Sequence, residues 1–369
     1  MRFVKWLFVV VLMVLGSGIH AQIVNNPEKP AAQDAGRIVK ITTVLRILDD
    51  GKSYFFKSPY IIKVAPDGSI FVADEEQLLQ FDKDGKFVRN HQKKGEGPGE
   101  CLFISNFQII GDHLFVVSPV PSKILEFDLS GKLIKENRGQ TIINLFPKIL
   151  DIKKDMYYSL YGDFKPGELK AGLIDFKQNI FVSTFAGKPK DLNLSFPIRR
   201  RLVIFKAGNN RTMTMIRDID FFCYNVENEN SLYVSHTQKY LVKHVDMANG
   251  KLLGEFRRPY NSVPYIQDAT DKKYPEVIPR EFFPDVEQIA MYKGKVWVFT
   301  STLDNQKGIL VDVFSKEGKY LDNFYLPFPM VTRPDVFEKN PLFVWEDFIF
   351  AAQRDEDENF SIVKYKIEI

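Results

Sequence analysis

Short runs of alternating apolar and polar residues recur in pairs along the chain. "PDGSIFVAD" at Pro66–Asp74 precedes "LLQFDKDGKFV" at Leu78–Val88, and "IGDHLFVVS" at Ile110–Ser118 precedes "ILEFDLSGKLI" at Ile124–Ile134. Alternation with a period of two predicts β-strands, and the Asp-x-x-Gly-Lys near the end of each second run is a turn signal. Each pair of runs therefore predicts two hairpins.

The same unit returns four more times with weaker similarity. The later copies are Lys153–Leu160 with Gly172–Val182, Asn228–Ser235 with Tyr240–Leu253, Tyr292–Thr300 with Ile309–Leu321, and Trp345–Ala352 with Ser361–Ile369. An apolar segment such as "YIIKV" at Tyr60–Val64 supplies an inner strand, so that each copy corresponds to four strands. Repeated four-stranded units are typical of β-propellers.

The two ends of the chain predict how these sheets close into a ring. The sixth copy stops at Ile369 without its outermost strand, and "RIVKITTVL" at Arg37–Leu45 is a strand without a partner at the other end. Pairing the two removes the open sheet edges. The pattern therefore predicts one all-β domain over residues 36–369, a six-bladed β-propeller closed by pairing an N-terminal strand with the last blade.

The glycine-rich "KKGEGPGE" at Lys93–Glu100 raises the alternative of a phosphate-binding loop. Such loops lead into a helix whose N-terminus faces the phosphates. The following "CLFISNFQII" alternates and is rich in branched and aromatic residues, which predicts a strand instead. We therefore interpret the segment as a joint between two blades.

The stretch from this joint through "LFVV" and "ILEFDLSGKLI" resembles the NHL-type repeat, in which Gly-x-Gly-Pro-Gly-Glu links one blade to the next. The resemblance covers Ser58–Asn137 and implies a six-bladed propeller of the NHL-like or TolB-like type found among exported bacterial proteins. NHL repeats place an Asn and an Arg after "VAD", whereas Asp74 is followed here by "EEQLLQF". The resemblance therefore implies a fold and no ligand.

The N-terminus predicts export. Arg2 and Lys5 precede the apolar run Trp6–Leu15, and small residues lead to Ala21, which together are typical of a secretory signal peptide over residues 1–21. The alternative is a retained anchor, but the apolar run is about half of what a bilayer-spanning helix needs. We expect a periplasmic or extracellular protein in which residues 22–35 are flexible.

Charge and composition exclude some functions. The formal net charge is +3, and Arg2 and Lys5 supply two of these charges, so the exported chain is nearly balanced. That balance argues against a nucleic-acid-binding protein. The 45% hydrophobic content is enough for a core without disulfides, and the pairing of Cys101 and Cys223 stays open. We expect a monomer with a protein, peptide or glycan partner.

Strand direction sorts the loops onto two faces. The turns between the first and second and between the third and fourth strands share one face, here called the lower face. The remaining loops and the connections between blades emerge on the upper face. The long segments expected there are 161–171, 186–201, 257–284 and 353–360. Because loops on a rigid ring accept insertions at low cost, the upper face is the predicted binding site.

Two groups of side chains are candidate ligand contacts on that face. Arg199, Arg200 and Arg201 would suit a carboxylate, sulfate or phosphate group. The alternative is that they form surface ion pairs with the acidic run 355–358. Tyr260 and Tyr265 lie in a proline-rich connection, where rings either contact a sugar or peptide or seal the connection against the next blade.

Catalytic and metal-binding signals are sparse, and the sequence predicts no catalytic residue, no metal site and no cofactor. Calcium is considered at the acidic run 355–358 and at "DKDG", Asp82–Gly85, but neither has the EF-hand spacing. The predicted function is an exported binding or interaction module. The alternative is a propeller hydrolase or lyase, lactonase-like, with a metal in the central channel, where the inner strands offer Asp151, Glu287 and Lys63.

Overall fold

The structure of the chain is a computed structural model. It describes residues 22–138, 148–153, 155–162, 172–185, 187–207, 211–220, 222–227, 230–267, 280–328 and 341–369, without the side chains of 203–207 and 211–218. The signal peptide expected at 1–21 lies outside the described residues, as does most of the upper-face segment expected at 161–171. The part of the chain that is described contains no helix long and apolar enough to cross a membrane.

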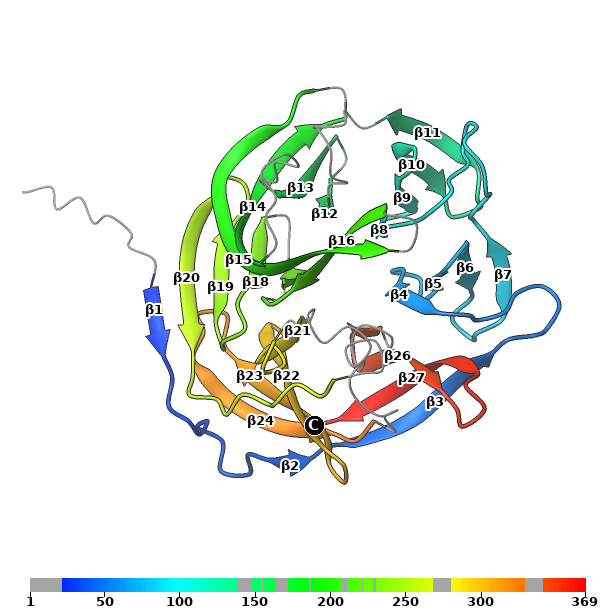
Figure 1. Cartoon of the computed structure of the whole chain (residues 1–369). Coiled ribbons are helices and arrows are strands. Elements are labelled where there is room, and N and C mark those ends of the chain that lie inside the picture. The colour runs from blue at the N-terminus through cyan, green and yellow to red at the C-terminus, as the bar shows by residue number, and fades with distance from the viewer. Residues whose placement is uncertain are drawn as a thin grey trace, which may run out of the picture.

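The strands form six sheets around a central axis, which confirms the predicted six-bladed propeller (Figure 1). Each blade begins with its innermost strand. Blade 1 comprises β4 (Pro59–Val64), β5 (Ile70–Asp74), β6 (Gln77–Phe81) and β7 (Phe87–Asn90). Blade 2 comprises β8 (Asn106–Ile110), β9 (His113–Pro119), β10 (Ser122–Asp128) and β11 (Leu133–Arg138). Blade 3 comprises β12 (Lys148–Ile152), β13 (Met156–Gly162), β14 (Gly172–Thr184), β15 (Lys190–Ala207) and β16 (Arg211–Asp218).

The other three blades also include strands from the N-terminus. Blade 4 comprises β17 (Cys223–Val226), β18 (Ser231–Ser235), β19 (Val242–Asp246), β20 (Lys251–Arg257) and β1 (Gln22–Asn25). Blade 5 comprises β21 (Val286–Tyr292), β22 (Lys295–Asp304), β23 (Gly308–Phe314), β24 (Tyr320–Leu326) and β2 (Arg37–Ile38). Blade 6 comprises β25 (Leu342–Trp345), β26 (Phe348–Arg354), β27 (Phe360–Glu368) and β3 (Lys40–Leu48).

Residues 22–48 form a belt around the outside of blades 4, 5 and 6 (Figure 1). β3 is antiparallel to β27, which confirms the predicted closure of the ring. The belt begins earlier than the sequence indicates, because β1 pairs in parallel with β20 within the segment expected to be flexible. Arg37–Ile38, expected beside the last blade, instead pairs in parallel with β24 of blade 5.

Asn26 fixes the start of this belt. Its Nδ2 donates to the carbonyl of Gly318 at 2.9 Å, and its Oδ1 accepts from the amide of Tyr320 at 2.8 Å. The backbone amide of Asn26 also donates to the carbonyl of Arg257. One buried side chain therefore connects the belt to both blade 4 and blade 5, which orders a segment whose composition alone favours a flexible chain.

The hydrophobic core lies in the seams between blades. One cluster combines Ile47 of the belt, Phe81 of blade 1 and Phe350 of blade 6, all at most 4% exposed. Each of the other five seams has a corresponding cluster. Because alternate residues of a strand face opposite sides of its sheet, every inner blade strand can supply side chains to both neighbouring seams. The repeated alternation in the sequence therefore encodes the ring.

The repeated Asp-x-x-Gly-Lys has a structural explanation. Asp82 Oδ1 accepts the amides of Asp84 and Lys86 at 3.0 and 2.9 Å, which stabilises the turn. Gly85 follows at a φ of 81°, and a Cβ there would lie 2.9 Å from Leu45 of the belt. Gly318 repeats this arrangement at a φ of 87°, with Phe256 of blade 4 within 2.5 Å of a Cβ. Glycine is needed both for the left-handed backbone and for close packing on the preceding blade.

The glycine-rich segment 93–100 links β7 to β8, which confirms the predicted joint between blades. The amide of Gly97 donates to Glu100 Oε2 and the amide of Gly99 to Glu136 Oε2, both at 3.0 Å. Buried Lys123 donates to the carbonyl of Gly97 at 2.8 Å. The chain's own carboxylates thus occupy the amides that a phosphate would require.

His91 gives the ring a predicted sensitivity to acid. Its Nε2 lies 2.8 Å from Gln80 Oε1, the residue is 6% exposed, and the buried Nδ1 has no hydrogen-bond partner among the residues described. Burial, assisted by Arg89, lowers the pKa of His91 from 6.5 to about 4. Between these values the unfolded chain binds more protons than the folded one, so stability falls as the pH is lowered through that window.

We expect this histidine to contribute a loss of about 3 kcal/mol in the free energy of unfolding between pH 6.5 and 4. The His91→Phe variant keeps a ring at the site and removes the titration, so its stability should decline less steeply over the same range. Urea unfolding at half-unit pH intervals measures both slopes. Equal slopes for the two proteins would contradict the assignment.

Candidate functional site

The largest departure from six regular blades is the hairpin β15–β16 of blade 3. The pairing of β14 with β15 begins where Val182 lies opposite Lys190 and ends where Gly172 lies opposite Leu202. Beyond Leu202, β15 pairs with β16 alone. In Figure 1 the hairpin projects across the middle of the ring. The prediction of a loop over 186–201 is therefore wrong from Lys190 onward. Phe196, Ile198 and Leu202 alternate as buried residues and make the segment a strand.

The three candidate arginines lie on β15 and have different environments. Arg199 donates from Nε and Nη2 to the two carboxylate oxygens of Asp220, each at 2.9 Å. Its partner is therefore Asp220 and not the acidic run at 355–358. The guanidinium of Arg200 lies 4.7 Å from the ring centre of Phe176, while half-buried Arg201 is paired in register with Arg217. The structure thus places these residues on one strand, with Arg199 engaged in an ion pair.

The two candidate tyrosines pack within the connection from blade 4 to blade 5. Tyr260 contacts Ser301 Oγ and Thr302 Oγ1 through its hydroxyl at 3.2 and 2.6 Å. The ring of Tyr265 lies edge-on to Phe283 with a centroid distance of 5.0 Å. The guanidinium of Arg280 lies 4.9 Å from the ring centre of Tyr265. These contacts agree with the sealing alternative and leave Tyr265 half-buried.

A buried ion pair that the sequence pattern did not predict holds the start of this connection. Arg258 donates to Asp312 Oδ2 from Nε at 2.8 Å and from Nη2 at 2.6 Å, with side chains 6% and 0% exposed. Tyr240 and Tyr320 donate their hydroxyls to the same carboxylate at 2.7 and 2.6 Å. Burial opposes the charge on Arg258, but Asp312 and the tyrosines raise its pKa above the ordinary value. The only sequence signal was Asp312 within the otherwise apolar "ILVDVF".

The acidic run at 355–358 occupies a tight turn between β26 and β27. Asp355 Oδ1 accepts the amide of Asn359 at 2.8 Å, and Arg354 lies 3.6 Å from Glu358. The prediction of a long upper-face segment here is therefore wrong, because Gln353 is already paired with Ser361, and Phe360 with Arg354, in the β26–β27 ladder. Over the described ranges, no three or more His, Cys, Asp or Glu side chains are placed to hold a metal ion.

The central channel contains a cavity of about 400 Å³ lined by the inner strands of five blades. Lys63 of β4, Gln108 of β8, Asp151 of β12 and Asn225 of β17 supply polar groups. Gln108 Nε2 donates to Asp151 Oδ1 at 3.0 Å, and Lys153 Nζ lies 2.5 Å from Asp151 Oδ2. The cavity thus includes two of the three charged residues that the sequence placed in the channel.

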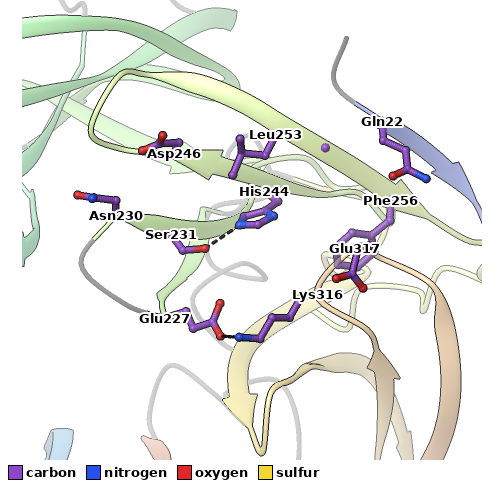
Figure 2. A pocket seen from close by; sticks show the side chains of 11 residues that line it. Gln22, Glu227, Asn230, Ser231, His244, Asp246, Leu253, Phe256, Lys316 and Glu317 are labelled. Atoms are coloured by element: carbon purple, nitrogen blue, oxygen red, sulfur yellow. Dashed lines mark hydrogen bonds and ion pairs between the residues drawn. The ribbon is translucent and has the colours of Figure 1, made fainter. Parts of the chain in front are cut away.

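A second cavity of about 540 Å³ opens on the lower face between blades 4 and 5 (Figure 2). Figure 2 shows His244 directed toward Ser231, with Nε2 and Oγ 2.6 Å apart, and Lys316 paired with Glu227. The His244 ring stacks on Tyr233 with a centroid distance of 4.2 Å. Within the described part of the chain no carboxylate hydrogen-bonds the other imidazole nitrogen, so the pair is not a Ser-His-Asp arrangement.

The remaining histidines and both cysteines have separate structural environments. His113 Nδ1 lies 2.8 Å from Glu126, and buried His236 Nδ1 lies 3.0 Å from the carbonyl of Pro197. Cys101 and Cys223 are free thiols buried in different seams. Burial raises the pKa of Cys101 to about 11 and that of Cys223 to about 12, which suppresses thiolate chemistry.

Comparison with known families agrees with this geometry. Residues 47–239 match the profile of the DUF5128 family, described as a 6-bladed beta-propeller. That match covers more than half of the chain, from the end of β3 to the loop after β18. Comparison with curated protein sequences found no match.

Two solved structures share the fold over most of their length. A protein of Bacteroides fragilis NCTC 9343, provisionally described as exported, aligns at 12% identity with a TM-score of 0.51, covering 94% of this chain and 100% of that one. A member of the DUF4221 family from Bacteroides vulgatus ATCC 8482 aligns at 11% identity with a TM-score of 0.54, covering 90% and 99%. At such identities the similarity concerns the fold alone.

Proposed function

The chain belongs to the DUF5128 family of six-bladed β-propellers, and from this premise we propose that it is an exported binding module whose upper face holds its partner. Export is supported by the signal-peptide pattern over residues 1–21. The Bacteroides fragilis protein of similar fold is provisionally described as exported as well. The Gly-x-Gly-Pro-Gly-Glu joint supports an NHL-like assignment within the propellers.

The observation that carries this proposal is the β15–β16 hairpin, which extends beyond its blade on the upper face. Between Arg199 and Arg217 the chain has six basic residues and no acidic one. The register places Arg201 directly opposite Arg217. Basic residues on both strands of the hairpin would suit the carboxylate, sulfate or phosphate groups of an anionic partner.

The proposed partner is a protein, peptide or glycan that carries anionic groups. Arg200 and Arg201 are the proposed contacts, and Arg199 is proposed to fix the base of the hairpin through Asp220. Tyr265 is half-buried and lies in the connection on the same face, so we include it in the surface. Tyr260 is proposed to hold that connection in place, because its hydroxyl already contacts Ser301 and Thr302.

A shortened hairpin tests the proposal. Residues 203–215 are replaced by Asn-Gly, which joins the cross-strand neighbours Leu202 and Ile216 through a two-residue turn. The tagged exported chain is then used to capture partners from an envelope extract of the cells that produce it. We expect a partner recovered with the wild type to be lost with the shortened variant and with Arg201→Glu.

The matched control reverses a charge on the opposite face. Lys83 is exposed in the lower-face turn between β6 and β7, so Lys83→Glu should leave capture unchanged. Thermal unfolding of each variant verifies that the ring is intact. Undiminished recovery of the same partner by the folded shortened variant would contradict the assignment of the upper face.

A further inference from the structure

The channel cavity contains a cation without a counter-ion of its own. Across the residues that the structure describes, Lys63 Nζ has neither a hydrogen bond nor an ion pair, and it lies 5.5 Å from the ring centre of Phe107. Asp151 is the carboxylate whose charge acts on the Lys63 ammonium, but it is already engaged by Lys153 and Gln108. Lys63 is therefore half-buried in a cavity where the one carboxylate among the described lining residues, that of Asp151, serves other groups.

This arrangement is costly for the folded chain. An ammonium group that loses water without gaining a partner is destabilised relative to its neutral form. Burial accordingly lowers the pKa of Lys63 to about 8, and Asp151 only partly opposes that shift. A charged group that is kept in a cavity at a cost to stability is a candidate for ligand binding.

The rest of the lining indicates which kind of anion would fit. Of the lining residues that the structure describes, Lys63 is the only cationic one, and Asp151 lies among them. One positive charge beside a carboxylate favours a ligand with a single negative charge over a dianion such as phosphate, which needs several donors. The amide side chain of Asn225 has no hydrogen-bond partner among the described residues and can complete the contacts to a carboxylate.

The apolar part of the lining and the volume of the cavity indicate the size and character of the ligand. Ile109 and Phe343, both half-buried, add apolar residues from two different blades to the lining of the same cavity. A volume of about 400 Å³ lies within the range typical of small-molecule sites. The cavity therefore combines one cation, several amides and an apolar wall, which matches an organic acid with a hydrocarbon body.

We infer that Lys63 is the anion-binding residue of a second site, and that the channel cavity accepts a small organic monocarboxylate with its carboxylate on Lys63 and its apolar part against Ile109 and Phe343. This site is separate from the hairpin that carries the proposed partner-binding function. The shortened-hairpin variant should therefore keep it. Failure of one proposal leaves the other intact.

Binding is measured by ligand-observed NMR and calorimetry with hexanoate and benzoate as probes and inorganic phosphate as the comparison anion. We expect both carboxylates to bind the wild-type exported chain and phosphate not to bind. Lys63→Met should weaken carboxylate binding by about tenfold or more, because it removes a charge-assisted contact. Lys63→Arg should retain most of the binding.

The matched control is Lys148→Met. Lys148 starts β12 beside the channel, but it is exposed and does not line the cavity, so its loss should leave the affinity unchanged. Because Lys63 makes no hydrogen bond or ion pair with the described residues, Lys63→Met should also melt at the wild-type temperature or above it. If Lys63 had a structural role, Lys63→Met would melt below the wild-type temperature.

Three outcomes would overturn the inference. The first is equal carboxylate affinity in the wild type and Lys63→Met, and the second is binding of phosphate in place of the carboxylates. The third is that the folded wild type binds no carboxylate at concentrations up to about 50 mM, which is far above the range of specific sites. Loss of carboxylate binding in Lys63→Met alone, with wild-type melting, would support it.

Discussion

Deletion of residues 22–48 is expected to abolish the cooperative unfolding transition of the ring. β3 pairs with eight residues of β27, and β1 and β2 cover the outer edges of blades 4 and 5. Without them three strands expose unpaired backbone groups, and the seam between blades 6 and 1 loses Ile47. The combined loss exceeds the roughly 5–15 kcal/mol by which a folded domain is stable.

Circular dichroism melting and size-exclusion chromatography of residues 49–369 test this expectation. The shortened chain should give no sharp transition and should elute as aggregates. A graded version uses one residue of β3: Ile47→Ala, at a site 4% exposed, should cost about 2–5 kcal/mol. Val44→Ala, on the same strand but 53% exposed, should change stability by less than about 0.5 kcal/mol. A deletion variant that melts sharply as a monomer would show that the belt does not close the ring.

Asp312→Ala is expected to give the second-largest loss, about 3–5 kcal/mol in the free energy of unfolding. The substitution leaves Arg258 charged and buried among Tyr240, Tyr260 and Tyr320, whose ring centres lie 4.9–5.3 Å from the guanidinium carbon. It also leaves the hydroxyls of Tyr240 and Tyr320 without their acceptor. Urea unfolding measures the loss directly.

Two further variants identify the cause of this loss. Arg258→Met combined with Asp312→Leu removes both charges and should recover most of the stability. Glu368→Ala removes one partner of the exposed Lys40–Glu368 pair and should change stability by at most about 1 kcal/mol, because exposed pairs contribute little. A loss below about 1 kcal/mol for Asp312→Ala would mean that the buried pair is not needed for the fold.

The repeated part of the fold could be predicted because its signals are local. Period-two alternation identifies strands such as Ile70–Asp74, and the Asp and Gly of each turn satisfy the backbone of that turn. Closure by β3 could be inferred because an unpaired strand at one end matched a missing strand at the other. The pairing of β1 with β20 could not be inferred, because parallel pairing with a strand more than 200 residues away has no local signal.

Two other misses have specific physical causes. Residues 186–201 were expected to form a loop, yet Pro197 lies on β15 opposite Lys177 of β14 and before the stretch that pairs with β16, so its missing amide hydrogen leaves the β15–β16 ladder intact. The Arg258–Asp312 pair joins residues from distant segments, so only the apolar neighbours of Asp312 hinted at it. Lys63 and Asp151 were placed in the channel correctly because both lie on predicted inner strands.

The belt also constrains the order in which the molecule can assemble. The belt precedes the blades along the chain, but β3 can pair only after β27, which follows the strands of all the other blades. Until the ribosome has finished, the outer edges of late blades and the early belt are both unpaired, and long-range pairing of this kind is slow. A nascent chain of this architecture therefore depends on being kept from aggregation until β27 has been made, and translation products truncated before Phe360 would never reach the native state.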